Sequence, residues 1–227
     1  MPESAILLPP RWRLAATSVV VVGALGVAAL GWWYADGRAA GPLDSVIDDR
    51  LISRGEGYEH LLWPLADLGS PPALVLGMVI LVVAAVRTHR RPAIVLAALG
   101  PPLASLVTEL ALKPLVGRTH FGGLSLPSGH ATSITAQVTV YLLAFAAVGL
   151  PRRALLRRAL IVAAPLVVLG VSGAMVSLER HYATDTVAGA MVGASVVCAL
   201  ALALDAWNRA RSARAARVPL SGQAGRG

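Results

Sequence analysis

The chain contains six long apolar stretches, and each is close to the length that a helix needs to cross a membrane. The hydrocarbon core of a bilayer takes about 20 apolar residues of α-helix. The stretches are Leu14–Tyr34, Ala66–Val86, Pro92–Leu112, Ala131–Leu150, Ala159–Leu178 and Ala183–Trp207. Of the 227 residues, 56% are hydrophobic and 14% are charged, whereas soluble domains are about 25% charged. The sequence therefore predicts an all-α, polytopic membrane protein built as a six-transmembrane-helix bundle.

Two of these stretches carry helix-breaking or polar residues. The second is interrupted by Gly69-Ser70-Pro71-Pro72, so its helix is expected to start nearer Ala73. The third contains Pro101-Pro102 and Glu109. Proline bends a helix, and an ionisable residue within a membrane span points to function. We therefore expect a kinked and functional third span.

The net charge of +8 is distributed as an orientation signal. Arginines gather before the first stretch, in every second connection and after the last stretch: Arg11, Arg13, Arg87, Arg90, Arg91, Arg152, Arg153, Arg157, Arg158, Arg209, Arg211, Arg214, Arg217 and Arg226. The connection 35–65 is acidic on balance. This positive-inside pattern places both termini in the cytoplasm. It also suits anionic lipid head groups, and we expect no nucleic-acid partner.

The pattern predicts one membrane domain over residues 14–207, a cytoplasmic N-terminus of residues 1–13 and a basic cytoplasmic tail of residues 208–227. A signal peptide is the competing reading of the N-terminus, but its apolar run exceeds the usual h-region. Residues 36–65 suit a short amphipathic helix on the membrane surface or a solvated loop. Cys198 is the only cysteine, so no disulfide framework is expected. Gly189 and Gly193 allow close helix packing, either within the molecule or in a homodimer.

Polar residues with chemical potential lie at the ends of the third, fourth and sixth stretches. They are Lys113, Arg118, Ser128, Gly129, His130, Arg180, His181 and Asp185. In the predicted orientation all of them fall on the extracytoplasmic side of the membrane. The loop charges and the positions of these residues therefore agree on a single face.

The pair His181 and Asp185 has the i, i+4 spacing that shares one face of a helix. A carboxylate there fixes the imidazole tautomer and leaves the other ring nitrogen free as a nucleophile. The alternative is a helix-capping aspartate beside an interfacial histidine. On a regular helix the neighbouring Arg180 would point about 100° away from His181.

The segment Pro127-Ser128-Gly129-His130 opens the fourth stretch. A glycine amide, a serine hydroxyl and a helix N-terminus together bind an anion, and a histidine there can act as a general acid. Lys113 and Arg118 suit phosphate oxygens, although cations at span ends also snorkel to the membrane surface.

Taken together, these residues resemble the phosphatidic acid phosphatase type 2 superfamily of membrane phosphatases, which is related to vanadium haloperoxidases. The likeness covers roughly residues 71–204. Its first motif, Lys, six residues, Arg-Pro, is matched at Lys113 and in the Gly117-Arg118 pair, with His120-Phe121 where Arg-Pro is expected. Its second motif, Pro-Ser-Gly-His, is intact at 127–130. Its third, Arg, five residues, His, three residues, Asp, is matched at His181 and Asp185, with Met175 in the arginine position.

The resemblance implies a catalytic role for each matched residue. His181 would attack phosphorus to give a phosphohistidine, Asp185 would orient it, and His130 would protonate the leaving oxygen and then activate water. Lys113, Arg118, Ser128 and the Gly129 amide would bind the phosphoryl oxygens, with His120 and Arg180 as candidates to replace the two missing arginines. No metal and no cofactor are implied. A phosphate-binding His120 would favour activity at acidic pH.

The predicted function is a plasma-membrane phosphohydrolase acting on a lipid monophosphate or diphosphate, such as an isoprenoid carrier diphosphate, phosphatidic acid or phosphatidylglycerol phosphate. The alternatives are a non-catalytic relative that binds phospholipid head groups, a lipid phosphotransferase and a transporter. The transporter hypothesis is the weakest, because polar residues at one face do not line a midplane pathway. The Arg- and Ala-rich composition with few lysines is typical of GC-rich bacteria.

Overall fold

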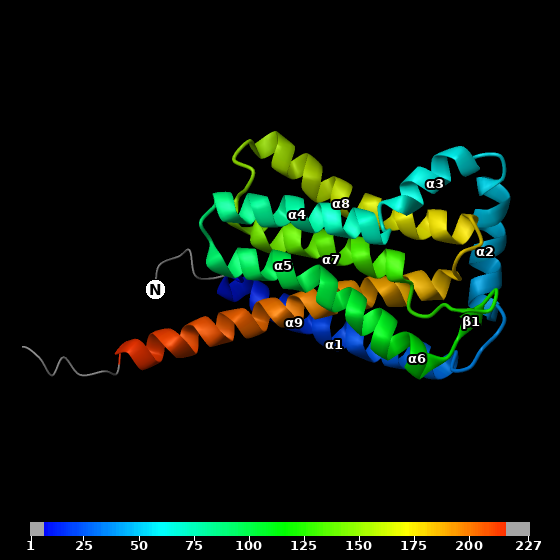
Figure 1. Cartoon of the computed structure of the whole chain (residues 1–227), viewed down its shortest axis with the longest axis horizontal. Coiled ribbons are helices and arrows are strands. Elements are labelled where there is room, and N and C mark those ends of the chain that lie inside the picture. The colour runs from blue at the N-terminus through cyan, green and yellow to red at the C-terminus, as the bar shows by residue number, and fades with distance from the viewer. Residues whose placement is uncertain (1–6, 217–227) are drawn as a thin grey trace, which may run out of the picture.

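The computed structural model describes residues 7–216 and shows an all-α protein (Figure 1). Its helices are α1 (Pro10–Trp33), α2 (Pro42–Gly55), α3 (Glu59–Asp67), α4 (Pro71–Arg87), α5 (Arg91–Leu106), the π-helix η2 (Val107–Leu112), α6 (Lys113–Val116), α7 (Gly129–Ala144), the 3-10 turn η3 (Ala146–Val148), α8 (Ala154–Ser177) and α9 (Ala183–Ala216). Two short strands, β1 (Thr119–His120) and β2 (Gly123–Leu124), form an antiparallel hairpin. The length and the hydropathy of the helices are those of a multi-pass membrane protein. Within the described residues, 5 helical segments are long and apolar enough to span a bilayer, and up to 6 if the bent pair α3–α4 counts as one.

The second span breaks where the sequence predicts. α3 ends at Asp67, α4 begins at Pro71, and the two helices meet at an angle of 50°. The third span remains continuous through Pro101 and Pro102 and instead becomes π-helical over Val107–Leu112, which contains Glu109. Such π-segments occur often at functional sites.

The last helix is longer than the predicted span. α9 continues past Trp207 to Ala216, so the first part of the expected tail is helical, and residues 217–227 lie outside the described chain. The acidic connection also forms helices, α2 and α3, at the end of the bundle that holds the hairpin. Its predicted position on the membrane surface stays a prediction.

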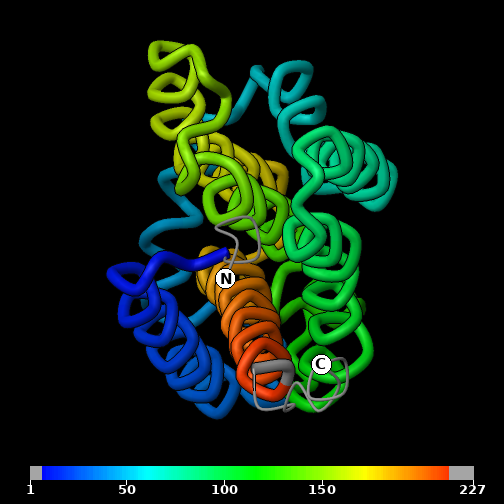
Figure 2. The backbone as a smooth tube through the Cα atoms, turned by 90° about the vertical axis from the view of Figure 1, so that its left-hand side faces the viewer, coloured from blue at the N-terminus to red at the C-terminus, as the bar shows by residue number. Residues whose placement is uncertain are grey.

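The centre of the bundle is formed by α7 and α9, with α1 and α5 packed around them (Figure 2). The core there is built mainly from small and branched residues such as Ala97, Ala136, Val140 and Val197. Many large apolar side chains point outward instead; Leu155, for example, is 83% exposed. Exposed apolar surface on this scale is the signature of helices that face lipid.

The close packing of α7 and α9 depends on Gly189 and Gly193. A Cβ atom at Gly193 would lie 2.5 Å from the Thr132 carbonyl oxygen, and one at Gly189 would overlap the Ser128 carbonyl oxygen. This glycine spacing is therefore used for packing within the molecule. A homodimer stays a prediction.

Candidate active site

Two adjoining cavities open beside the start of α7, at the end of the bundle that carries the hairpin. The wider cavity measures about 580 Å³ and is lined by His120, Met175 and Arg180, among others. The narrower cavity measures about 480 Å³ and lies against α4 and α5. Lys113, His130 and His181 line both cavities. The structure thus brings three of the predicted site residues, from three separate motifs, to one junction.

His181 and Asp185 lie together, but not on one regular helix. His181 precedes α9, which begins at Ala183, and Asp185 occupies the first turn of that helix. The His181 Nδ1 atom lies 3.5 Å from Asp185 Oδ2 and is too poorly aligned to count as a hydrogen bond. Catalytic contacts of this kind are often loose until substrate binds. Hydrogen bonds from Arg118 and from the Tyr182 amide hold the Asp185 carboxylate in place. The carboxylate is therefore positioned to orient the His181 ring.

Asp185 also caps its own helix. Its Oδ2 atom accepts a hydrogen bond from the Tyr182 amide at 3.1 Å. An acidic side chain at the third helical position that accepts from the residue before the helix is one half of a capping box. Both interpretations of the motif therefore hold in part: Asp185 caps α9 and also faces His181.

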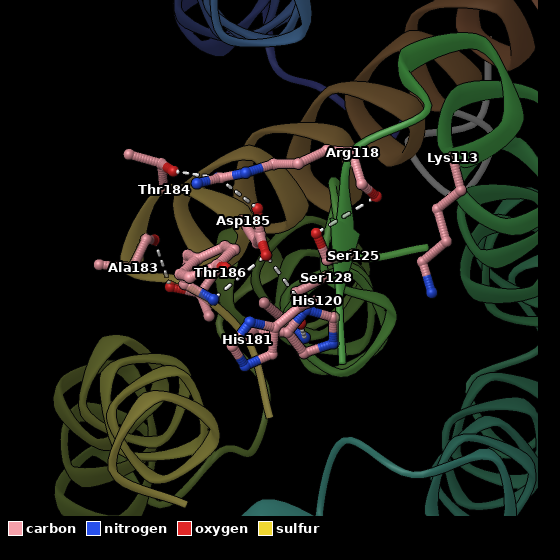
Figure 3. Close-up of polar contacts among 12 residues, drawn as sticks. Lys113, Arg118, His120, Ser125, Ser128, His181, Ala183, Thr184, Asp185 and Thr186 are labelled. Atoms are coloured by element: carbon pink, nitrogen blue, oxygen red, sulfur yellow. Dashed lines mark hydrogen bonds and ion pairs between the residues drawn. The ribbon is translucent and has the colours of Figure 1, made fainter. Parts of the chain in front are cut away.

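Arg118 is fully buried behind this pair. Its Nη1 atom donates to Asp185 Oδ1 at 2.7 Å and to the Thr184 hydroxyl at 2.8 Å, and its Nη2 atom donates to Asp44 Oδ2 at 2.6 Å. The guanidinium is sandwiched between the rings of Tyr34 and Tyr182, at 4.0 and 4.1 Å. Figure 3 shows the chain of contacts from Arg118 through Asp185 to His181. In this arrangement Arg118 holds Asp185 and lines neither cavity.

Two further carboxylates, Asp44 and Asp48 on α2, complete this cluster, and the sequence motifs do not include them. Asp44 Oδ1 accepts from the Thr184 amide at 2.9 Å, and Asp48 Oδ1 accepts from the Ala183 amide at 3.1 Å. They therefore bind the otherwise unpaired amides at the start of α9, where the helix dipole favours negative charge. Their i, i+4 spacing in a helix-forming loop is the one signal in the sequence that could have suggested a shared buried face.

The two α2 carboxylates have opposite pKa shifts. Burial acts to raise the pKa of Asp44, but hydrogen bonds from Arg118 and Thr184 outweigh it and hold that pKa below its usual value. Burial raises the pKa of Asp48 to about 6, and the hydrogen bond from the Ala183 amide offsets this only in part. Asp48 lacks the arginine contact that its neighbour has, which accounts for the difference.

The start of α7 presents Gly129 and His130 to the cavities. Ser128 is the N-cap: its hydroxyl oxygen is 3.5 Å from the Ala131 amide, and its own amide donates to the Asp185 carbonyl at 2.9 Å. Ser128 is fully buried and lines neither cavity, whereas Gly129 and His130 line the narrower one. Ser128 thus joins the starts of α7 and α9, and Gly129 is the member of the motif that can approach an anion.

Lys113 lies at the end of η2 and is paired there with Glu109. Lys113 Nζ is 2.9 Å from Glu109 Oε1, and the exposed fractions of the two side chains are 13% and 47%. A hydrogen bond of 3.0 Å between the hydroxyls of Thr108 and Thr132 joins η2 to α7. Glu109 lines the narrower cavity. The sequence marked this glutamate as a polar residue of a functional helix but gave it no place in the site.

The two positions at which the family pattern has an arginine, His120 and Met175, both face the wider cavity. Met175 is buried and packs in an apolar cluster with Ile134 and Val171, so it supplies no charge there. His120 lies in the hairpin, its Nε2 atom is 2.9 Å from the Glu179 carbonyl oxygen, and its ring packs edge-on against Tyr182.

Arg180 lines the wider cavity, contrary to the expectation from a regular helix. The segment between α8 and α9 is a turn in which the amides of Arg180 and His181 both donate to the Met175 carbonyl, at 2.9 and 3.3 Å. The Arg180 guanidinium carbon lies 5.7 Å from the centre of the Trp63 ring. Because the turn replaces helical geometry, Arg180 and His181 reach the same cavity.

Comparison with known proteins gives one family and one solved structure. The family model of the PAP2 superfamily matches residues 72–209. The fold is similar to the crystal structure of the first transmembrane PAP2 type phosphatidylglycerolphosphate phosphatase from Bacillus subtilis, with a TM-score of 0.60 and 16% sequence identity, over 90% of this chain and 98% of that one. No curated protein matches the sequence.

Proposed function

Because the chain belongs to the PAP2 superfamily, we propose that it is an integral-membrane phosphohydrolase that removes phosphate from a lipid monophosphate or diphosphate. The observation that carries this proposal is the junction of the two cavities, where Lys113, His130 and His181 meet with Asp185 behind His181. A nucleophile, a proton donor and a cation within one concave site are the parts that phosphoryl transfer requires.

The reaction proceeds in two steps. In the first, the Nε2 atom of His181 attacks phosphorus, the bond from phosphorus to the oxygen of the leaving group breaks, and His130 donates a proton to that oxygen; this oxygen belongs to the lipid alcohol in a monoester and bridges the two phosphates in a diphosphate. In the second, His130 takes a proton from water, the water oxygen attacks phosphorus, and the phosphorus–nitrogen bond breaks to release orthophosphate. Asp185 keeps the proton of His181 on Nδ1, so the attacking nitrogen carries a free electron pair.

The phosphoryl oxygens bind to groups that line the wider cavity and to the start of α7. Lys113, Arg180 and the Gly129 amide supply the positive charge and the donor, and His120 adds a charge when protonated. Arg180, held over the Trp63 ring, takes the part of the arginine that Met175 replaces. Arg118 and Ser128 act one layer behind, since Arg118 holds Asp185 and Ser128 joins the two helix starts.

The charge distribution supports an extracytoplasmic site. The connection between α4 and α5, with Arg87 to Arg91, and the segment that leads from α7 into α8, with Arg152 to Arg158, lie at the end of the bundle opposite the hairpin (Figure 1). The start of α1 and the end of α9 lie at that same end. By the positive-inside rule that end faces the cytoplasm. The substrate is then a lipid of the outer leaflet, and the bilayer phospholipids are its surroundings.

The test is phosphate release by the purified protein in detergent, with EDTA present, on a panel of lipid phosphates between about pH 5 and 8. Wild-type protein should release phosphate without a metal, and His181→Ala should reduce the rate by roughly 10³-fold or more. His60→Ala, which alters an exposed histidine on α3, is the matched control and should retain the rate.

Three outcomes would contradict the proposal or a part of it. Substantial turnover by His181→Ala would remove the nucleophile assignment. Silence of the wild-type protein on every lipid, with phospholipid still bound, would favour the non-catalytic alternative, which the buried Met175 in the wider cavity supports. Transfer of phosphate to an added lipid alcohol would identify a phosphotransferase.

A further inference from the structure

The Glu109 carboxylate lies inside the proposed phosphate site, where a negative charge opposes the binding of an anion. Its Oε1 atom is paired with Lys113 Nζ at 2.9 Å. The same oxygen rests over Gly129, where a Cβ atom would overlap it. Glu109 therefore neutralises one of the cations of the site and lies next to the glycine that would approach a phosphoryl oxygen.

The two cavities differ in the part of the substrate that each can accept. The wider one carries Arg180 and His120, which suit the phosphoryl group under attack. The narrower one carries the apolar residues Pro71 and Leu74 from α4, which suit an emerging lipid chain. The leaving group must lie beside His130 and connect the phosphoryl group to the lipid chain, so we place it on the side of His130 that faces the narrower cavity, which Glu109 lines.

The charges in the narrower cavity affect the leaving group of a monoester and that of a diphosphate differently. Of the described residues that line it, Glu109 and Lys113 carry permanent charges, which cancel, and the proton that His130 carries passes to the leaving group. The leaving group of a monoester departs as a neutral alcohol after protonation. The leaving group of a diphosphate is itself a phosphate anion, which would lie beside the Glu109 carboxylate, and like charges at short range repel each other.

We propose that Glu109 is a specificity-determining residue that restricts the site to lipid phosphate monoesters and disfavours diphosphates. This inference rests on the proposed phosphatase function. The Glu109–Lys113 pair is partly exposed, and exposed ion pairs are weak. The incoming phosphoryl group can therefore take Lys113 from Glu109. Once His130 has given its proton to the leaving group, a second phosphate finds no other cation of permanent charge among the described residues that line the narrower cavity.

The experiment compares kcat/KM for farnesyl monophosphate and farnesyl diphosphate, which share one alkyl chain. The wild-type protein should favour the monophosphate. Glu109→Gln keeps the side-chain shape, removes the charge and frees Lys113. It should raise kcat/KM for the diphosphate by about tenfold more than for the monophosphate, which corresponds to about 1.4 kcal/mol.

The matched control is Glu179→Gln, which removes the same charge from the rim of the wider cavity. It should change kcat/KM for both substrates by one common factor. A wild-type preference for the diphosphate, or an equal response of both substrates to Glu109→Gln, would overturn the inference.

A binding experiment separates this inference from the proposed function. If the wild-type protein hydrolyses neither these two substrates nor any other lipid phosphate of the panel, the phosphatase proposal fails, and thermal stabilisation by orthophosphate and by pyrophosphate still tests Glu109. Glu109→Gln should then increase the stabilisation by pyrophosphate more than that by orthophosphate. Equal increases would overturn the inference on this arm as well.

Discussion

At the residue scale, the start of α9 is surrounded by one buried cation and three buried carboxylates. Arg118 binds Asp44 and Asp185 directly, whereas Asp48 has the Ala183 amide as its partner. The partial positive charge of a helix N-terminus, about half an elementary charge, offsets only part of the negative excess. Asp48 is the member of the cluster that carries the electrostatic cost, as its raised pKa of about 6 indicates.

This cost predicts a pH-dependent gain of stability in Asp48→Asn, whose amide oxygen still accepts from Ala183. Below about pH 4, Asp48 is protonated in both the folded and the unfolded state, so the substitution should have little effect. As the pH rises, the unfolded chain loses this proton first, and the wild-type protein loses stability until the pKa of about 6 is passed. The advantage of Asp48→Asn should therefore grow between these values and then stay level, at roughly 1–3 kcal/mol.

Thermal unfolding in detergent, followed by tryptophan fluorescence, measures this difference across the pH range. The conservative substitution Asp49→Asn on the exposed face of α2 is the control. A difference between wild type and Asp48→Asn that does not vary with pH would show that Asp48 titrates normally in the folded protein.

At the element scale, the contact between α7 and α9 positions the two histidines relative to each other. Gly189 of α9 lies against the Ser128 carbonyl, one residue before Gly129 and two before His130. A methyl group there must move backbone, because the atom that it meets is a main-chain oxygen and not the end of a flexible side chain. The site thus depends on a glycine that takes no part in the chemistry.

We expect Gly189→Ala to lower the stability by about 1–3 kcal/mol, the usual cost of overpacking, and to reduce kcat by displacing His130. Gly173→Ala is the matched control, since a Cβ atom at Gly173 has no neighbour within 4 Å. Thermal unfolding and phosphate release on both variants measure the two effects. Equal behaviour of the two variants would mean that α7 and α9 have room to separate.

The hairpin β1–β2 determines where His120 lies in the site. Phe121 and Gly122 both have positive φ, 45° and 80°, as a two-residue turn of this type requires. Proline, which the family pattern places at position 121, cannot adopt positive φ. The replacement of Arg-Pro by His120-Phe121 therefore goes together with a tight turn that brings His120 against Tyr182.

At the scale of the whole molecule, the bundle has two chemically distinct ends. The cavities, α2 and the hairpin lie at one end, and the arginine-bearing connections lie at the other (Figure 1). By the positive-inside rule this asymmetry predicts the direction of insertion. The sidedness of the site can be measured without any knowledge of the substrate.

Single cysteines report this sidedness in intact cells. Cys198 is 4% exposed and is expected to remain unlabelled, and Cys198→Ser gives a clean background. A membrane-impermeant maleimide should label Glu56→Cys, at the end of α2, and should reach Arg153→Cys, before α8, only after the membrane is permeabilised. The reverse pattern would place the site in the cytoplasm.

The sequence alone predicted the helical membrane fold, the break at Gly69–Pro72 and the membership of the family. These features depend on the length and polarity of local segments and on short motifs, which the chain order records directly. It also predicted that Lys113, His130 and His181 serve one site, because each motif lies at a span end on the same side.

The tertiary structure decided which of the polar residues reach the cavities. Arg118 and Ser128 are held behind the site, and Arg180 and Glu109 are brought into it. The sequence could not distinguish these cases, because a cation at a span end looks the same whether it meets a phosphate or a buried carboxylate. Asp44 and Asp48 come from a connection more than 130 residues away from the helix start that they cap. Only the packing of α2 onto α9 brings those charges together, since electrostatic partners are set by distance in space and not by distance along the chain.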